Sequence, residues 1–208
     1  YVSYLPCTIL ADGVPVSIPL QEKNEFKLTA EELEAAITPK TKILVMPFPN
    51  NPTGSIMTKE DLEPIVEIVK KYDLFVISDE IYSELSYKGE HVSIASFEGM
   101  KERTILINGF SKSHSMTGWR LGYITAPEEI IERAKKVHDF LTVGCAAPLM
   151  EAVMPALQFG QDYYDDLLAK YTHKKEQICI HSSGFLINSI PSARIRTISP
   201  GPIKRSIS

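Results

Sequence analysis

A lysine and an arginine stand among small residues in the segment 108–123, directly after a short apolar run. They are Lys112 and Arg120, with Ser, Thr and Gly among the residues between them. A lysine amine can act as a nucleophile or a base, and the planar guanidinium of an arginine binds phosphate or carboxylate groups through paired hydrogen bonds. The plainer interpretation is that both side chains are solvated in a loop.

Two further polar stretches each follow an apolar run of strand length. The residues 49–54 read Pro-Asn-Asn-Pro-Thr-Gly, whose Asn-Pro and Thr-Gly pairs interrupt both helices and strands, so they predict a tight turn that carries Asn51. The residues 78–82 read Ser-Asp-Glu-Ile-Tyr. Their plain interpretation is a polar strand end at which Asp79 caps a following helix. Alone, each stretch is typical of an ordinary loop.

Helices and strands alternate along the chain around these stretches. Thr29 with Glu32, and Thr58 with Asp61, have the spacing of capping boxes, so each pair predicts the start of a helix. The second helix has apolar residues spaced for one buried face. Pro64 lies beyond its first turn, where a proline removes a backbone donor, so we expect a bend or a delayed start there.

Three apolar runs predict strands and two later segments predict helices. We expect strands at 42–48, 74–78 and 104–107, and helices at 128–141 and 146–159. Apolar strands between amphipathic helices indicate an α/β fold whose mostly parallel sheet is covered by helices on both faces. Ligands of such sheets bind beyond the carboxyl ends of the strands, so the stretches that follow these strands are expected to converge at one edge.

Together the three stretches resemble the class I and II aminotransferases, which are pyridoxal-phosphate-dependent enzymes of fold type I. The resemblance runs from Tyr1 to about Glu176, with the stretches in the family's order and spacing, and residues 108–123 are its most specific part. It implies the large domain of that fold over residues 1–176, a three-layer α/β/α structure with a mostly parallel sheet. Residues 78–87 and 111–120 most resemble bacterial enzymes that act on amino acids such as N-acetyldiaminopimelate.

The resemblance implies a role for five residues. Lys112 takes the position of the lysine that binds pyridoxal 5'-phosphate covalently and then moves the α-proton of the substrate. Asp79 takes the position of the carboxylate that keeps the ring nitrogen of the cofactor protonated. Asn51 and Tyr82 match the residues that hold the phenolic oxygen of the ring. Arg120 matches the arginine that binds the phosphate.

Five more residues are interpreted by the same resemblance or by packing rules. Tyr1 takes the position of the aromatic residue that stacks on the cofactor ring. Gly109 stands where relatives have a phosphate-binding serine, so one donor is expected to be missing or supplied elsewhere, with Ser111 as a candidate. His114 and Trp119 are interpreted as packing residues, because a lone histidine or tryptophan packs more often than it catalyses.

The composition is typical of a globular, soluble protein and argues against several classes of function. A formal net charge of -4, with both signs interspersed, gives no basic surface for nucleic acid and no polybasic membrane anchor. The expected partner is therefore a small molecule or another protein, and the resemblance implies an amino acid and a 2-oxo acid. The three cysteines lack C-x-x-C spacing, which argues against disulfides and zinc and favours the cytoplasm. No run reaches membrane-spanning length.

Parts of the family's architecture are expected to be missing. By the resemblance, the chain before Tyr1 supplies a phosphate-binding helix and contacts within a homodimer, and a small domain supplies an arginine for the substrate carboxylate. Residues 177–208 contain none of the 26 acidic residues, and residues 181–208 show neither helical nor strand periodicity. We expect residues 177–208 to be an atypical tail, produced by a shift of reading frame, or else a divergent genuine end.

Three functions remain open. The first is a transaminase that moves an amino group from an amino acid to a 2-oxo acid, as an incomplete fragment whose activity is doubtful. The second is a carbon–sulfur β-lyase, because such lyases keep the same lysine motif. The third is a non-catalytic remnant without a productive active site. The sequence does not identify the amino acid, since a few side chains in a pocket shift substrate preference strongly.

Overall fold

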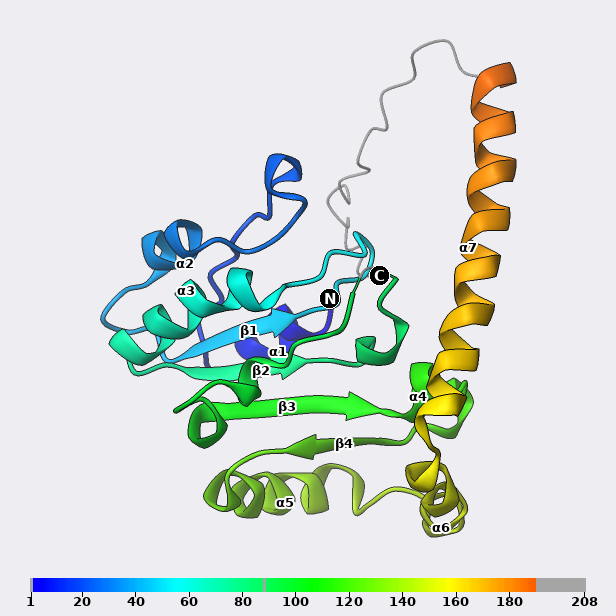
Figure 1. Cartoon of the computed structure of the whole chain (residues 1–208). Coiled ribbons are helices and arrows are strands. Elements are labelled where there is room, and N and C mark those ends of the chain that lie inside the picture. The colour runs from blue at the N-terminus through cyan, green and yellow to red at the C-terminus, as the bar shows by residue number, and fades with distance from the viewer. Residues whose placement is uncertain (1, 88, 190–208) are drawn as a thin grey trace, which may run out of the picture. The chain divides into compact units, whose positions relative to one another are not determined.

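The fold is that of a computed structural model, which describes residues 2–87 and 89–189, with side chains as far as residue 178 (Figure 1). The chain forms two compact units, Tyr1–Lys170 and Tyr171–Ser208. The first unit contains the sheet and the three polar stretches. The second begins inside the long helix α7 (Gln161–Ser189). A domain division at residue 176 remains a prediction.

A four-stranded sheet forms the centre of the first unit. Its strands are β1 (Ile43–Pro47), β2 (Phe75–Asp79), β3 (Thr104–Gly109) and β4 (Gly122–Thr125), in the order β1-β2-β3-β4. The first three strands are parallel, and β4 runs antiparallel to β3. The three expected strands and the mostly parallel sheet are therefore confirmed. Strand β4 was not expected from the sequence.

Both predicted capping boxes are present. Helix α2 (Ala30–Ala36) begins after Thr29 and α3 (Lys59–Lys71) after Thr58, and each threonine Oγ1 accepts a hydrogen bond from the backbone N–H three residues on, at 3.3 Å. Helix α3 starts directly after its cap and continues through Pro64, so the expected delayed start is wrong. The cap satisfies first-turn donors, and buried apolar side chains offset the hydrogen bond that the proline removes. These side chains are Leu62, Ile65, Val66, Ile68 and Val69.

The carboxylate of Asp61 links this cap to the N-terminal part of the chain. Its Oδ2 accepts hydrogen bonds from Lys27 Nζ at 2.7 Å and from the backbone N–H of Thr58 at 2.8 Å. Partial burial alone would raise the pKa of Asp61, but the hydrogen bonds from Lys27 and Thr58 outweigh it and lower that pKa below its ordinary value. The ionised form of Asp61 is therefore the one that stabilises the start of α3.

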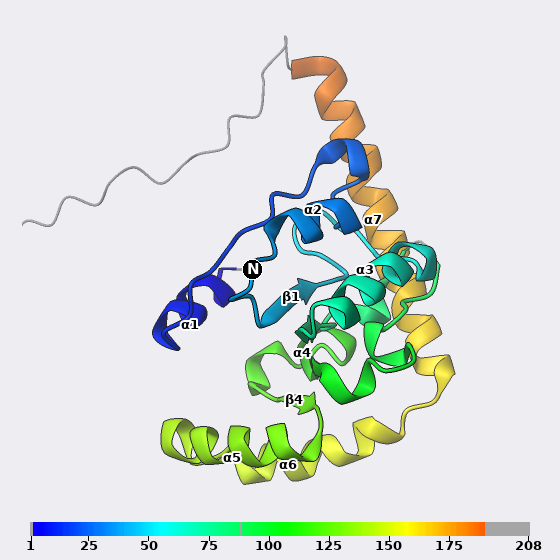
Figure 2. The same ribbon diagram turned by 90° about the vertical axis from the view of Figure 1, so that its left-hand side faces the viewer.

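Helices lie on both faces of the sheet. Helices α2 and α3 cover one face, and α1 (Tyr4–Leu10) lies on the other (Figures 1 and 2). The main core lies between the sheet and α2 and α3. Its most buried members include Leu33, Met46, Leu62, Ile65, Val69, Leu74, Val76, Ile94 and Met100. This arrangement is the expected α/β architecture.

The second half of the first unit is mainly helical. Helix α4 (Phe110–Ser113) is followed by α5 (Glu128–Thr142) and α6 (Ala147–Val153). The single helix expected at 146–159 is wrong, because a 3-10 helix, Met154–Gln158, with a proline in its first turn follows α6. The other 3-10 helices are Glu22–Asn24, Ser83–Leu85, Ile94–Ser96, Lys101–Arg103 and Thr117–Trp119. Helix α7 continues to Ser189, although residues 181–189 lack helical periodicity.

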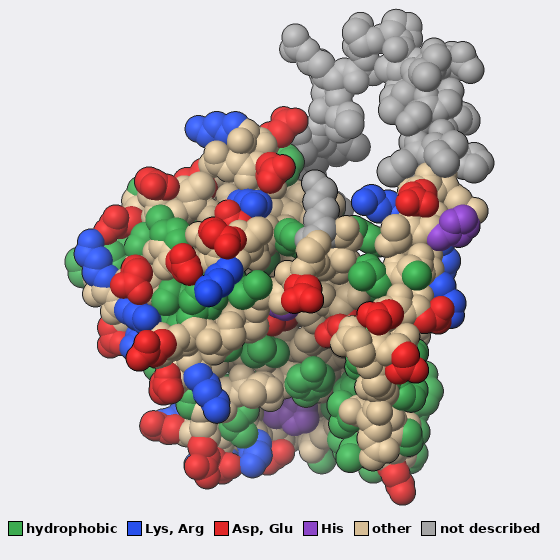
Figure 3. Space-filling model, in the orientation of Figure 1, with side chains coloured by type: hydrophobic (Ala, Val, Ile, Leu, Met, Phe, Trp, Pro, Cys, Tyr) green, Lys and Arg blue, Asp and Glu red, His purple; other side chains and the backbone are tan. Residues whose placement is uncertain are grey.

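Both charged and apolar side chains are exposed on the surface of this unit. Over α2 and α3, acidic and basic side chains alternate on the surface (Figure 3). Helix α5 buries no residue, and its apolar side chains include Phe140, which is 93% exposed. Within the described residues, no helix is both long and apolar enough to cross a membrane.

Candidate active site

The carboxyl ends of β1, β2 and β3 lie side by side. Pro47, Asp79 and Ile107 are paired across the three strands in the sheet register. The segments that follow these positions carry the polar stretches that the sequence analysis singled out. They therefore leave the sheet at one edge, as the parallel topology requires.

Asn51, Tyr82 and Lys112 are brought together at this edge. The Nδ2 of Asn51 donates a hydrogen bond to the hydroxyl of Tyr82 at 3.1 Å, across 31 positions of sequence. The amine nitrogen of Lys112 lies 5.6 Å from the centre of the Tyr82 ring, within cation–π range. Tyr82 and Lys112 are half-buried, whereas Asn51 is exposed. One residue from each polar stretch thus contributes to a single group of side chains.

The turn that carries Asn51 is held by local hydrogen bonds. The backbone N–H of Asn50 donates to the carbonyl of Ser55, and that of Gly54 donates to the carbonyl of Asn50, both at 2.8 Å. Gly54 has φ of +70°, a conformation that favours glycine. The predicted tight turn is therefore confirmed.

Asp79 ends β2 and has two hydrogen-bond donors. Its Oδ1 accepts from the backbone N–H of Ile81 at 3.2 Å, and its Oδ2 accepts from the hydroxyl of Tyr4 in α1. The residues after Asp79 form only the short 3-10 helix Ser83–Leu85, so the plain interpretation of a helix cap is wrong. Sequence reasoning missed Tyr4, because 75 positions separate it from Asp79 and no motif links them.

Hydrogen bonds and ring contacts fix the short helix α4, which carries Lys112. Ser113 Oγ donates to the carbonyl of Gly109 at 3.1 Å, and the Tyr163 hydroxyl donates to the carbonyl of Ser113 at the same distance. The ring of His114 stacks on those of Phe159 and Tyr163 at 5.6 and 5.5 Å between centroids. These contacts agree with the interpretation of His114 as a packing residue.

Backbone packing accounts for the glycine at position 109. A Cβ atom there would lie 2.9 Å from the Cα of Gly122 and 3.0 Å from the carbonyl oxygen of Leu121. A serine would therefore push β4 away from β3. The preceding residue, Asn108, donates to Ser83 Oγ at 3.3 Å and so ties β3 to the segment of Tyr82. This role of Asn108 was not expected from the sequence.

Among the described residues, Arg120 is not part of this group of contacts. Arg120 is exposed, lies in the left-handed region with φ of +57°, and donates from Nη1 to the carbonyl of Thr117 at 2.9 Å. It follows Lys112 by eight positions along the same connection between β3 and β4. Tyr1 lies outside the described residues. The roles of both residues stay predictions.

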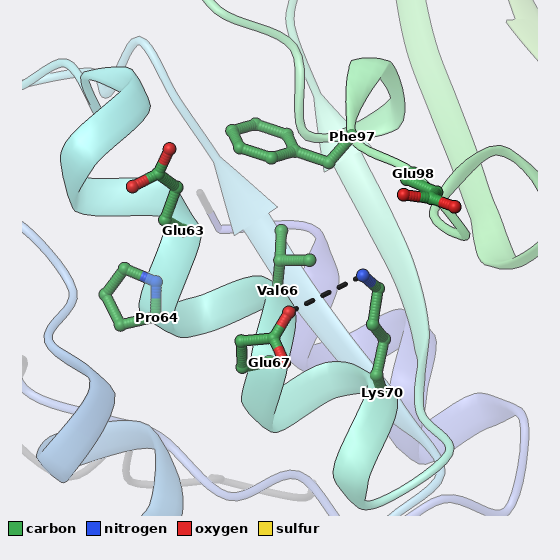
Figure 4. A pocket seen from close by; sticks show the side chains of 7 residues that line it. All are labelled: Glu63, Pro64, Val66, Glu67, Lys70, Phe97 and Glu98. Atoms are coloured by element: carbon green, nitrogen blue, oxygen red, sulfur yellow. Dashed lines mark ion pairs between the residues drawn. The ribbon is translucent and has the colours of Figure 1, made fainter.

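A separate hollow of about 430 Å³ lies between α3 and the segment of Phe97 (Figure 4). Val66 and Phe97 contribute apolar side chains to its lining, and Glu67 and Lys70, which also line it, form an ion pair at 3.5 Å. Its lining includes none of the five predicted site residues that the structure describes. The hollow is therefore distinct from the edge at which the strands end.

Comparison with known proteins identifies the family. The family profile described as aminotransferase class I and II matches residues 1–200. The chain belongs to the class I and II aminotransferases. The aminotransferase match extends beyond residue 176, where the resemblance was predicted to end. Aminotransferases of this family depend on pyridoxal 5'-phosphate.

Individual aminotransferases are similar in sequence and in structure. An aromatic-amino-acid aminotransferase 2 from Thermococcus litoralis is 52% identical over 134 residues, which are 64% of this chain and 34% of that protein. A probable N-acetyl-LL-diaminopimelate aminotransferase from Bacillus subtilis is 43% identical over 84% of this chain and 43% of its own length. The crystal structure of an aromatic aminotransferase from Pyrococcus horikoshii superposes with a TM-score of 0.82 at 42% identity, covering 86% of this chain and 48% of that one.

The chain spans about a third to a half of the length of these aminotransferases. The names of the relatives differ in the amino acid they specify. The match therefore shows the family and the fold, and the activity and substrate of this chain are matters of proposal.

Proposed function

We propose that this chain forms the cofactor-binding part of a pyridoxal-phosphate-dependent transaminase, which moves an amino group from an amino acid to a 2-oxo acid. The observation that carries the proposal is the position of the Lys112 amine, 5.6 Å from the ring of Tyr82, whose hydroxyl is bonded to Asn51. These three residues come from three different strand ends. A lysine amine in this place is accessible for covalent binding of an aldehyde.

The donor set suits pyridoxal 5'-phosphate. The cofactor offers a ring nitrogen that binds a carboxylate, a phenolic oxygen that binds donors, and a phosphate that binds cations. Asp79 would accept a hydrogen bond from the protonated ring nitrogen and keep that proton in place. Tyr82 and Asn51 would donate to the phenolic oxygen, and Arg120 would bind the phosphate through its guanidinium.

Each of the chain's own residues has a separate task in this scheme. When bound, the cofactor supplies an electron sink for the negative charge that develops on the substrate's α-carbon. Lys112 would hold the cofactor through its amine until the amino group of the substrate replaces it. The freed amine would then take the proton from the α-carbon as a base and deliver it to the C4' carbon of the cofactor as an acid. Tyr4, which donates to Asp79 Oδ2, would fix the orientation of the carboxylate that faces the ring nitrogen.

We propose further properties of this chain from its family and from its cysteines. We propose a homodimer, since aminotransferases of this family are typically dimeric, and a role in amino acid biosynthesis. A cytoplasmic location is supported by the cysteines, of which Cys7 and Cys145 are free thiols in the described part. Tyr1 is proposed to stack on the cofactor ring. Residues 1–176 are proposed to form the cofactor-binding domain.

The proposal is tested by titrating the purified chain with pyridoxal 5'-phosphate and following the visible absorbance of the lysine-bound cofactor. We expect a saturable band that is absent in Lys112→Ala and retained in Lys136→Ala, a matched change on the exposed face of α5. A band of equal intensity in Lys112→Ala would contradict the assignment of Lys112.

The reaction type is tested separately, with a panel of amino donors and 2-oxo acids. Formation of a new amino acid that requires a 2-oxo acid supports a transaminase. Release of pyruvate and ammonia from cystathionine without any 2-oxo acid would instead indicate the β-lyase.

A further inference from the structure

Glu80 is a buried carboxylate that follows Asp79 directly in sequence. Only 3% of its surface is exposed, and it lies among apolar side chains that include Met46, Leu62 and Ile94. The void beside it measures about 10 Å³, at most the space of one water molecule. A carboxylate in such surroundings is stable only when the protein itself supplies its hydrogen bonds.

Three side chains supply these hydrogen bonds. Glu80 Oε1 accepts from Ser78 Oγ at 2.8 Å and from Ser93 Oγ at 2.7 Å. Glu80 Oε2 lies 2.7 Å from Nε2 of His91. The backbone is also fixed, because the N–H of Glu80 donates to the carbonyl of Ile107 in β3 at 2.9 Å. The carboxylate is therefore held on both oxygens.

The two adjacent carboxylates face opposite sides of the sheet. Side chains alternate along a strand, so Ser78 and Glu80 lie on the face covered by α3, and Asp79 points to the face of α1. The hydrogen bond from Tyr4 to Asp79 agrees with this alternation. Glu80 is thus separated from the group that would meet the cofactor ring.

The hydrogen bonds of Glu80 close the base of a loop. The chain leaves the sheet at Glu80 and returns to the same carboxylate at His91 and Ser93. Tyr82 lies between these two anchor points, two residues after Glu80, with its hydroxyl bonded to Asn51. The loop begins with a turn in which the N–H of Ser83 donates to the carbonyl of Glu80 at 2.9 Å. The orientation of this turn depends on where Glu80 is fixed.

We propose that Glu80 is a positioning residue, which joins the two ends of the loop through His91 and Ser93 and so sets Tyr82 at the strand ends. The cofactor-related part of this inference rests on the proposed function, because it takes Tyr82 as a donor to the cofactor. The closure of the loop by Glu80 is independent of the proposed function. Glu80 acts through Tyr82 and does not touch the cofactor.

Hydrogen exchange of the cofactor-free chain tests the closure of the loop. In Glu80→Ala, amide exchange in the peptide covering residues 81–87 should rise by about tenfold or more, since hydrogen bonds to a buried charge are worth about 1.5–3 kcal/mol. Exchange in α2 should not change. In Glu80→Gln, the amide oxygen can accept from both serines, and the NH₂ group can donate to His91 Nε2 in the tautomer that carries its hydrogen on Nδ1, so exchange should return close to that of the wild type.

A matched control and a milder variant keep this test decisive. Glu90→Ala removes an exposed carboxylate from the same loop and should leave the exchange of residues 81–87 unchanged. Ser93→Ala removes one of the three partners and should give an intermediate increase, which decides the matter if Glu80→Ala does not fold. Equal exchange increases in α2 and in residues 81–87 would overturn the proposal, as would a Gln variant as loose as the Ala variant.

Cofactor binding gives the second measurement. The dissociation constant for pyridoxal 5'-phosphate should rise by about tenfold in Glu80→Ala and stay near the wild-type value in Glu80→Gln and Glu90→Ala. A loosened loop with unchanged cofactor affinity would overturn the link from Glu80 through Tyr82 to the cofactor. A wild-type chain that binds no cofactor, while Glu80→Ala still loosens the loop, would contradict the proposed function and leave the closure of the loop supported.

Discussion

Replacing Gly109 by serine would test the packing of β3 against β4 next to Lys112. A Cβ atom at position 109 would lie 2.9 Å from the Cα of Gly122 and 3.0 Å from the carbonyl oxygen of Leu121. Both are backbone atoms, so no side-chain rotation relieves the overlap. Overpacking of this kind costs about 1–3 kcal/mol. With a denaturant slope of about 2 kcal/mol/M, the urea midpoint of Gly109→Ser should fall by about 0.5–1.5 M.

Urea unfolding followed by the fluorescence of Trp119, the single tryptophan, measures this change close to the altered site. Gly118→Ser is the matched control, because a Cβ atom at Gly118 would meet no atom within 4 Å. Its free energy of unfolding should stay within about 0.5 kcal/mol of the wild type. Equal midpoints for the wild type and Gly109→Ser would show that β4 moves aside without cost. That result would refute the steric explanation for glycine at position 109.

Three further predictions concern stability. The pKa of Asp61 is lowered in the folded chain by hydrogen bonds that outweigh the effect of burial, so its stabilising contribution is present above its ordinary pKa and is lost as the pH falls through the lower, folded value. Asp61→Asn should therefore flatten the acid side of the stability–pH curve, and an unchanged acid slope would contradict this. Ile65→Ala should lower the free energy of unfolding by about 2–5 kcal/mol because the side chain is fully buried, whereas Phe140→Ala should change it by less than about 0.5 kcal/mol. Equal losses in chemical denaturation would contradict the difference in burial between these two side chains. Tyr4→Phe should lower the free energy of unfolding by about 1–2 kcal/mol by removing the donor to Asp79, and an unchanged urea midpoint would mean that the hydrogen bond contributes nothing.

The helices with local signals were predictable from the sequence. Thr29 with Glu32 and Thr58 with Asp61 form capping boxes whose partners lie three residues apart, so the pattern alone defines the start of each helix. Pro64 misled the prediction because its effect depends on packing. The apolar side chains that α3 buries against the sheet come from a tertiary contact that the local pattern does not contain.

The candidate site was only partly predictable, for a related reason. The parallel order of β1, β2 and β3 explains why residues from three stretches meet at one edge, and the expected strand ends were sufficient to anticipate it. Contacts between segments that are distant in sequence leave no pattern in the sequence from which they could be predicted. The hydrogen bond from Tyr4 to Asp79 and the closure of a loop by Glu80 require two parts of the chain to be placed in space first.

Position 109 is a single residue whose packing could not be predicted from the local sequence. The resemblance to the family led us to expect a serine at this position, whereas the structure brings Gly122 in β4 too close for a Cβ atom. Strand β4 has only four residues, and all four are exposed, so it lacks the buried apolar run that marked the other strands. Neither β4 nor its effect on Gly109 could be read from local patterns.

Covalent mapping of the cofactor tests the assignment of Lys112 most directly. The purified chain is mixed with pyridoxal 5'-phosphate, treated with sodium borohydride to make the link permanent, digested, and analysed by mass spectrometry. We predict that the pyridoxyl-phosphate group is found on the peptide that contains Lys112, at a cofactor concentration that leaves exposed lysines such as Lys136 unlabelled. Labelling spread evenly over exposed lysines, or concentrated on a lysine other than Lys112, would contradict the proposed active site.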